Sequence, residues 1–332
     1  MLFIQDALEH EYAYAKSFYL PVVNVRRNHA DLMTALACVY GVRDSDSHTQ
    51  AAIKINRTRQ LAINRVYDLA RFALRMPVRG LILDPRYCDL NRLYRGFKQC
   101  VRCRPSGVIY PPSLQRKKFY SCKSDHFCPA CWARLMAAEY RKIQSAFQKL
   151  FIAEPRVTAH LVSFARTLRL PEISDATYTT PDVFSAAVYK LNEELDLLSG
   201  SVYRDSRRAC PTRRAKKNRA IRGAYWRVIP VPTATGVTVH YRRVVLCGGA
   251  ARPEVLAVPK YTMASRSLLV SPRAVHMATQ SLVSFISPYP REYLTEDLEL
   301  TGVCLNAVGA RRCIAGAGVL RGVGRFNEKK ER

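Results

Sequence analysis

The chain has 332 residues, with 53 lysines and arginines against 26 aspartates and glutamates, and a formal net charge of +27. The hydrophobic fraction of 48% and the 18 tyrosines predict a folded protein and exclude a chain that is disordered throughout. Such a basic chain attracts polyanions, so nucleic acid is the partner that we expect.

A membrane is not an expected partner. The sequence has no apolar run near the ~18 residues of a spanning helix, and it has neither a basic amphipathic anchor nor a lipidation motif. An acidic residue, Asp6, follows the start at once and no apolar run comes behind it, so we expect no secretory leader. Eleven cysteines in a chain without a leader are typical of a reducing compartment.

The first 95 residues are predicted to be mostly helical. Apolar residues at three- and four-residue spacing predict helices over 31–40 and 50–74. The polar segment 45–49 between them is predicted to form a turn that caps the second helix. This second helix carries four arginines that either lie on a phosphate backbone or form a solvated face, namely Arg57, Arg59, Arg65 and Arg71.

Residues 96–150 contain two Cys-x-x-Cys pairs a short loop apart, with Cys122 and His126 as further donors. Two such turns supply the thiolates of a closed tetrahedral site, so we predict structural zinc, with a redox or disulfide role as the alternative. A helix predicted over 132–150 begins directly after the second pair, and the positive end of its dipole favours thiolates. Four ligands suffice, with Cys103 and Cys122 as the doubtful members of the set Cys100, Cys103, Cys122, Cys128 and Cys131.

A strand, a helix and a basic run follow. The β-branched and apolar residues of 157–168, bounded by Pro155 and Pro171, predict a central strand. Apolar spacing over 181–198 predicts a helix. Residues 203–222 are densely basic and predict a mobile loop or frayed helix that either contacts a nucleic-acid backbone or is merely solvated. The predicted DNA-binding residues there are Arg207, Arg208, Arg213, Arg214, Lys216, Lys217, Arg219 and Arg222.

Residues 223–231 and 236–247 predict two strands, with a hairpin connection over 232–236. Side chains alternate along a strand, so the second strand is sorted onto two faces. One face carries Thr238, His240 and Arg242, and the other carries Val239, Tyr241 and Arg243.

The remainder of the chain predicts shorter elements. The apolar run 254–259 is short and is interpreted as an edge strand. A helix is predicted over 271–286, where Ser271 and Pro272 form its start, and a second helix over 297–310. Residues 311–325 are glycine-rich and basic, which is a weak phosphate-loop signal because the Gly-Lys-Ser/Thr ending is missing.

From about residue 95 to 325, the order of these features resembles the rolling-circle replication initiators of small plasmids and single-stranded DNA phages, which are histidine–hydrophobic–histidine nickases. The resemblance rests on the segment that ends in Cys128, Cys131 and Arg134, on the strand containing His160, and on the segment from Gly223 to His240. It implies an α+β fold in which a five-stranded antiparallel sheet has helices on one side. Here the endonuclease domain would span 151–325, after a helical region 1–95 and the zinc segment 96–150, and before a charged tail 326–332.

The resemblance also implies a chemistry. Two histidines on a central strand hold Mg²⁺ or Mn²⁺, which polarises a DNA phosphodiester, and a tyrosine attacks it and becomes linked to the 5′ end. This chain departs from the motif, because His240 is followed two residues later by Arg242 and preceded by Thr238. An arginine would repel the metal ion but could contact the phosphate. His160 on the neighbouring strand is the candidate second imidazole, or else a core histidine.

The nucleophile is the second departure. By helix register the tyrosine falls near Phe285, which has no hydroxyl. Tyr289, Tyr293 and Tyr261 are the alternatives, together with the absence of an active tyrosine.

Three functions are therefore weighed, of which the first is our prediction and the other two are its alternatives. The first is a nickase that starts rolling-circle replication in the cytoplasm of a bacterial host, on single-stranded origin DNA and with host replication proteins as further partners. The second is a protein on the same scaffold that binds DNA without cleaving it, in origin recognition or copy control, which Arg242 and Phe285 motivate. The third is a related single-strand transposase, because such enzymes also begin with a cysteine-rich zinc segment.

Overall fold

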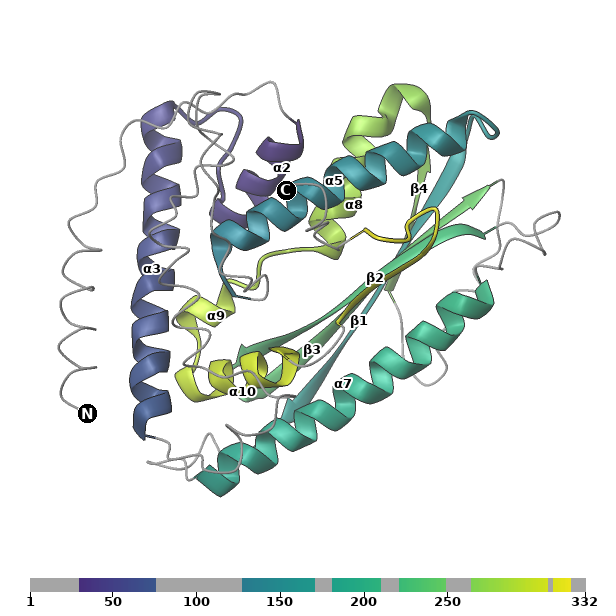
Figure 1. The fold of residues 1–332 in the computed structure, drawn as a ribbon. Coiled ribbons are helices and arrows are strands. Elements are labelled where there is room, and N and C mark those ends of the chain that lie inside the picture. Colours follow the sequence, from purple (N-terminus) through teal and green to yellow (C-terminus); the bar gives the residue numbers. More distant parts are fainter. Residues whose placement is uncertain are drawn as a thin grey trace, which may run out of the picture.

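A five-stranded antiparallel sheet forms the centre of the protein (Figure 1). The computed structural model describes residues 30–75, 127–170, 181–209, 221–248, 264–309 and 313–323. The strands follow the order β4-β1-β3-β2-β5 across the sheet, so β3 is the central strand. Their bounds are β1 Val157–Arg169, β2 Ile221–Thr233, β3 Gly236–Gly248, β4 Ala264–Val270 and β5 Ile314–Gly318. The predicted α+β class with an antiparallel sheet and flanking helices is confirmed.

Strands β2 and β3 form a long hairpin. Thr233 pairs with Gly236, which leaves two residues in the turn, fewer than the connection predicted over 232–236. Gly236 has a φ of 139°, and a Cβ at this position would lie 2.2 Å from the Leu168 carbonyl oxygen of β1. A glycine is therefore required where the hairpin meets the neighbouring strand.

Strand β1 is paired on both sides. It pairs along its whole length with β3, and its first seven residues, 157–163, pair with β4. The outer strand on this side is thus β4, whereas the predicted edge strand 254–259 lies outside the described residues.

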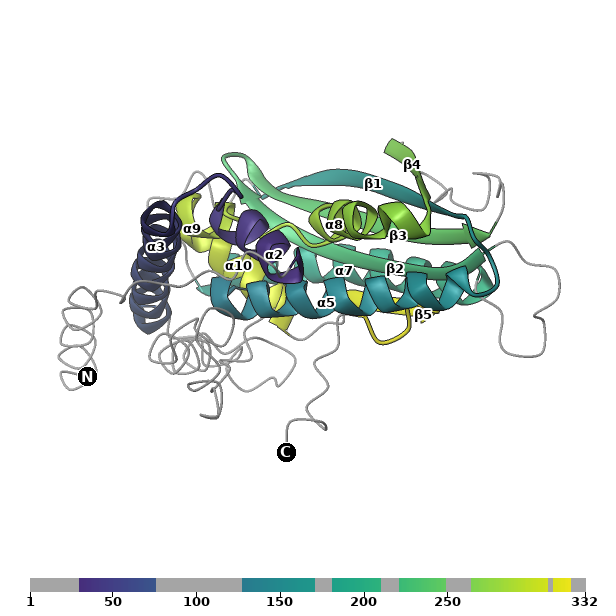
Figure 2. The ribbon, with the colours of Figure 1, turned by 90° about the horizontal axis from the view of Figure 1, so that it is seen from above.

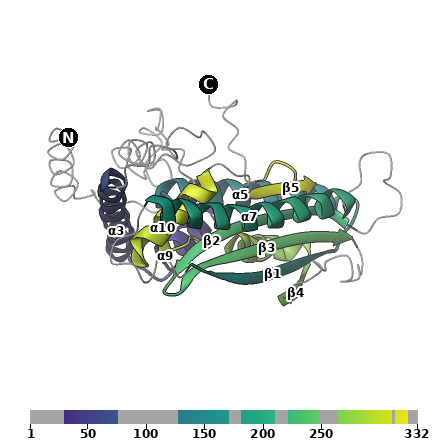
Figure 3. The same ribbon diagram turned by 90° about the horizontal axis from the view of Figure 1, so that it is seen from below.

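Helices cover both faces of the sheet (Figures 2 and 3). Helices α5 (Pro129–Phe151) and α8 (Val275–Ile286) lie on one face, which we call the α8 face, and α7 (Pro181–Ala209) lies on the other, the α7 face. Arg242 of β3 contacts α8, whereas Arg166 of β1, which points to the opposite side, forms an ion pair with Glu194 of α7. The resemblance implied helices on one side, and this expectation was wrong.

The remaining helices extend the core beyond the sheet. They are α2 (Ala30–Tyr40), α3 (His48–Arg75), the 3₁₀ turn η5 (Pro272–Ala274), α9 (Glu292–Thr295) and α10 (Leu298–Gly309). Helix α10 lies beside α7, and Gly302 of α10 permits close approach of Phe72 from α3 and Phe184 from α7, whose rings are 5.6 Å apart. One contiguous hydrophobic core joins α2, α3, α5, the sheet, α7, α8 and α10.

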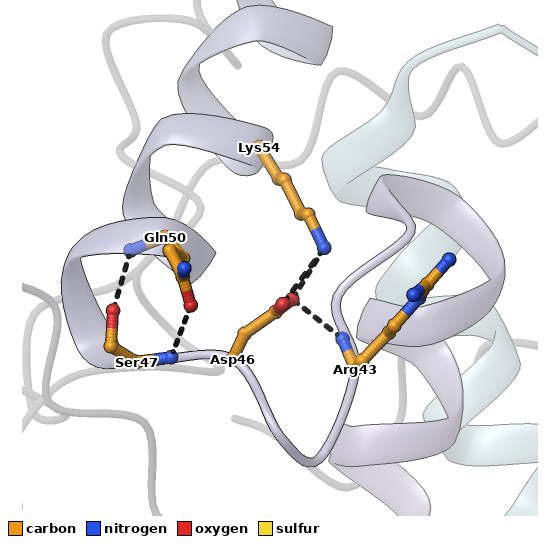
Figure 4. Close-up of polar contacts among 5 residues, drawn as sticks. All are labelled: Arg43, Asp46, Ser47, Gln50 and Lys54. Carbon is orange, nitrogen blue, oxygen red and sulfur yellow. Dashed lines mark hydrogen bonds and ion pairs between the residues drawn. The ribbon is translucent and has the colours of Figure 1, made fainter.

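The start of α3 shows how the sequence fixes a helix boundary (Figure 4). The Gln50 amide donates to the Ser47 hydroxyl at 3.2 Å, and the Ser47 amide donates to the Gln50 side-chain oxygen at 2.9 Å. This reciprocal capping box satisfies a helix N–H that would otherwise lack a partner, and such a cap contributes about 1 kcal/mol. Asp46 accepts from the Arg43 amide and pairs with Lys54. The predicted cap in 45–49 is confirmed.

Each helix and strand that the sequence predicted within the described ranges is present there. Strands β4 and β5 and the short helix α9 were not predicted, and β5 lies within the glycine-rich segment 311–325. Helix α7 was predicted to end at 198 and continues to Ala209. The first part of the basic run, 203–209, is therefore helical, and 210–220 lie outside the described residues.

Candidate nucleic-acid interface

The central strand presents different residues to the two faces, as the alternation predicted. Arg242 lies opposite Ser163 of β1 and Arg227 of β2, and all three belong to the α8 face. Tyr241 stacks on Phe164 on the α7 face, with their ring centres 4.8 Å apart. Of the residues that the resemblance made candidates, His240 therefore lies on the α8 face, together with Arg242.

Arg242 and Phe285 contact each other. The Arg242 Nη1 donates to the main-chain carbonyl of Phe285 at 2.6 Å, and its guanidinium lies 5.7 Å from the centre of the Phe285 ring. Phe285 is in the last turn of α8, where carbonyls lack intrahelical partners and the helix dipole is negative. A cation is thus stabilised at this helix end, and the two departures from the nickase motif meet in one place.

His240 is half-buried beside this contact. Burial lowers the pKa of His240, the charge of Arg242 lowers it further, and Glu292 at the start of α9 opposes both effects. The imidazole is therefore neutral at neutral pH.

His160 does not join His240. Ala165 is the β1 residue opposite His240, and His160 is five residues earlier, so its side chain points to the α7 face. It is 6% exposed and its Nδ1 is 2.8 Å from the Ser267 hydroxyl oxygen of β4. Burial lowers the pKa of His160 as well. The two histidines cannot share a metal ion, and His160 is a core residue.

Beyond the C-terminal end of α8, the α8 face carries an open strip of β1 and β3. Its small and polar residues are exposed or half-buried, and the hydroxyls of Thr167 and Thr238 are 2.9 Å apart. Two exposed arginines lie on the same face, Arg169 at the end of β1 and Arg266 on β4. The open strip consists of Ser163, Ala165, Thr167, Thr238, His240 and Arg242.

Two of the three candidate tyrosines are core residues. The Tyr289 hydroxyl donates to the Phe127 carbonyl at 2.9 Å, and the Tyr293 hydroxyl donates to the Pro230 carbonyl. Burial raises the pKa of both phenols well above the ordinary value. Neither hydroxyl is placed to reach a phosphodiester, and Tyr261 lies outside the described residues.

The second Cys-x-x-Cys pair opens α5, as predicted. Cys128 is the N-cap residue in an extended conformation, Pro129 is the first helical residue, and Cys131 lies in the first turn. Both cysteines are buried. Two thiols on one helical turn fit half of a structural zinc site. Cys100, Cys103 and Cys122 lie outside the described residues, so zinc stays a prediction.

A buried polar network anchors α5 to the sheet. Glu139 of α5 accepts hydrogen bonds from Tyr225 and Arg227 of β2 and from the Ser287 hydroxyl after α8. Trp132 donates to the Ser287 carbonyl at 3.0 Å, and Arg227 lies 5.0 Å from the centre of the Trp132 indole. Burial, followed by the charge of Glu139, raises the pKa of Tyr225, which keeps the phenol a donor. The sequence analysis did not predict this network. Its signal was a charged residue among the apolar residues of each partner element, Glu139 in α5 and Arg227 in β2.

The arginines of α3 have different roles. Arg57 is exposed, whereas Arg65 turns inward and donates from Nε to the Tyr293 carbonyl at 2.9 Å. Arg71 lies 5.1 Å from the centre of the Tyr67 ring. Arg65 is thus a structural residue that joins α3 to α9.

The predicted DNA-binding residues of the basic run are only partly described. Arg207 and Arg208 belong to α7, and Arg222 at the start of β2 forms an ion pair with Glu154. The others lie outside the described residues, namely Arg213, Arg214, Lys216, Lys217 and Arg219.

Within the described ranges, no three His, Cys, Asp or Glu side chains are grouped so that they could hold a metal ion. The residues on the α8 face, one imidazole beside a guanidinium, do not fit the predicted Mg²⁺ or Mn²⁺ site.

Among the described residues, no helix is both long enough and apolar enough to cross a membrane. Comparisons of the chain with protein-family models, curated proteins and solved structures find no match.

Replacing Glu139 by glutamine should strongly destabilise the protein. The change leaves the buried guanidinium of Arg227 without a counter-charge, and breaking a buried pair in this way costs about 3–5 kcal/mol. Denaturant unfolding followed by tryptophan fluorescence measures the loss. The exposed Glu193→Gln is the control and should stay within about 0.5 kcal/mol of the parent. Equal losses in the two variants would contradict the role of the network.

The purified chain should contain about one tightly bound zinc ion, because two Cys-x-x-Cys turns make one closed site. Elemental analysis should show that Cys128→Ser and Cys131→Ser each lose the metal, whereas Cys304→Ser, a buried cysteine of α10, keeps it. A metal-free parent whose cysteines are joined by disulfides in mass spectrometry would refute the zinc site.

Proposed function

We propose that the protein is of the replication-initiator type and binds single-stranded origin DNA on the α8 face without cleaving it. The contact between Arg242 and Phe285 carries this proposal. The resemblance expects a histidine at the position of Arg242 and a tyrosine at the position of Phe285. The two residues lie side by side, as a metal-binding histidine and a nucleophilic tyrosine of one active site would.

The chemistry of the site favours binding over cleavage. Attack by a tyrosine requires a phenol beside a phosphate and a means of stabilising the developing charge. The α8 face has Phe285 in place of the phenol, while Tyr289 and Tyr293 hold main-chain carbonyls in the core. Arg242 uses one of its five N–H donors on Phe285, and a guanidinium presents its other donors in a geometry that suits phosphate oxygens.

The surface around Arg242 supports a single strand as the ligand. The small side chains of the open strip allow a sugar-phosphate backbone to approach the sheet, and Arg169 and Arg266 add positive charge along it. The net charge of +27 supplies the long-range attraction. Under this proposal the setting is the cytoplasm of a bacterial host, the role is origin recognition or copy control, and zinc is structural.

The decisive assay uses labelled single-stranded DNA from the replicon's own origin, incubated with manganese or with EDTA and run on native and denaturing gels. We expect a shifted complex on the native gel under both conditions and no covalent adduct on the denaturing gel. An adduct that needs manganese and disappears in His240→Ala would instead establish the nickase. Mass spectrometry of that adduct would then name the tyrosine.

The double variant with Arg169→Ala and Arg266→Ala tests where the DNA lies. Both side chains are exposed, so the fold should persist, while single-strand affinity should fall about tenfold. The slope of log affinity against log salt should shrink by about 0.7 for each phosphate contact that is lost. Lys149→Ala, an exposed cation near the end of α5, is the matched control. Equal effects of the control and the double variant would place the DNA elsewhere.

A further inference from the structure

Helix α3 carries an exposed stripe of two apolar side chains with a cation between them. Ile53 is 60% exposed and Leu61 is 39% exposed, and Arg57 between them is also exposed. Residues four apart lie above one another on a helix, so the three side chains form one continuous line on its outer surface. We call these residues the α3 stripe.

Helix α7 carries a stripe of the same design with the opposite charge. Tyr189 is 60% exposed, Leu197 is 67% exposed, and the exposed Glu193 lies midway between them. This α7 stripe has the same four-residue spacing. It is apolar and acidic on a chain whose net charge is +27.

We infer that the α3 stripe of one copy of this chain docks on the α7 stripe of another copy. In each stripe the charged residue lies midway between two apolar residues. Arg57 therefore meets Glu193 whether the two helices pack parallel or antiparallel. In either direction, Ile53 and Leu61 meet the apolar residues of the partner stripe. The matched spacing and the opposite charges thus identify the α7 stripe of a second copy as the partner of the α3 stripe.

The contact joins two unlike surfaces, because the stripes lie on two different helices, α3 and α7, which run in different directions (Figure 1). Heterologous contacts of this kind build rings or filaments. One helix pair buries less than the ~1,200 Å² of a stable interface, and like-charged copies repel one another. The association is therefore weak, and it is favoured where copies are concentrated. It does not depend on the proposed DNA binding, and it is measured without DNA.

Sedimentation velocity over a concentration series of the full chain at physiological salt tests the contact. The parent should show self-association that strengthens with concentration. Arg57→Glu and Glu193→Arg place like charges opposite each other, so each single variant should weaken association about tenfold or more. The double variant restores an opposite-charge pair and has the net charge of the parent, so its association should return to within about threefold of the parent's. Lys149→Glu, a charge reversal outside both stripes, should leave association unchanged.

Three results would overturn the contact. The first is a parent that stays monomeric throughout the series. The second is a double variant that associates no better than the single variants. The third is an Arg57→Glu variant that loses affinity for single-stranded DNA and keeps its self-association, because the α3 stripe would then be a phosphate contact.

Discussion

The buried carboxylate of Glu139 is the constraint on which the rest of the structure depends. It lies in the middle of α5, is inaccessible to solvent, and meets a guanidinium that is almost as deeply buried on β2. Charges removed from water are tolerated only when they are paired and hydrogen-bonded. Tyr225 and Ser287 supply the additional bonds, so this single side chain fixes α5, β2 and the segment after α8 relative to one another. The same helix begins with Cys128 and Cys131, and a metal held there would be tied to the sheet through rigid packing.

Around the central strand β3, one face of the sheet is packed against helix α7, and the other face is partly open to solvent. On the α7 face, β3 supplies Val239 and Tyr241 to the core. On the α8 face its residues beyond the end of α8 remain accessible, and Arg242 is held by the last turn of that helix. The Phe285 carbonyl already orients the Arg242 guanidinium, so the phosphate contact that we propose would need no movement of the backbone. Under the proposed function, the Arg242 guanidinium at this helix end would supply the positive charge for the phosphate, where the resemblance implies a divalent metal ion.

Much of the fold follows from local pattern, because a strand of β-branched residues or a helix of regular apolar spacing is decided by its own sequence. The helices α2, α3, α5, α7, α8 and α10 and the strands β1, β2 and β3 were predicted on that ground, and so was the cap at Ser47, whereas β4, α9 and β5 were not predicted. Relations between elements were harder. Whether His160 and His240 share a face depends on the register of β1 against β3. The sequence of neither strand indicates that register. Tyr289 and Tyr293 were candidates for the nucleophile because each has a hydroxyl. The carbonyls of Phe127 and Pro230 that accept their hydrogen bonds are distant along the chain, so the sequence did not indicate that these hydroxyls are occupied.

The position of β1 in the sheet has a consequence for synthesis on the ribosome. Both of its partners, β3 and β4, come later in the chain than β1 and the long helix α7. At about 5–20 residues per second, β1 therefore waits several seconds for the hairpin, which closes locally through its two-residue turn. A chain interrupted before Gly236 contains β1 and neither of its neighbours. Such a fragment presents two unpaired edges of an apolar strand, and it is a natural substrate for chaperones and proteases.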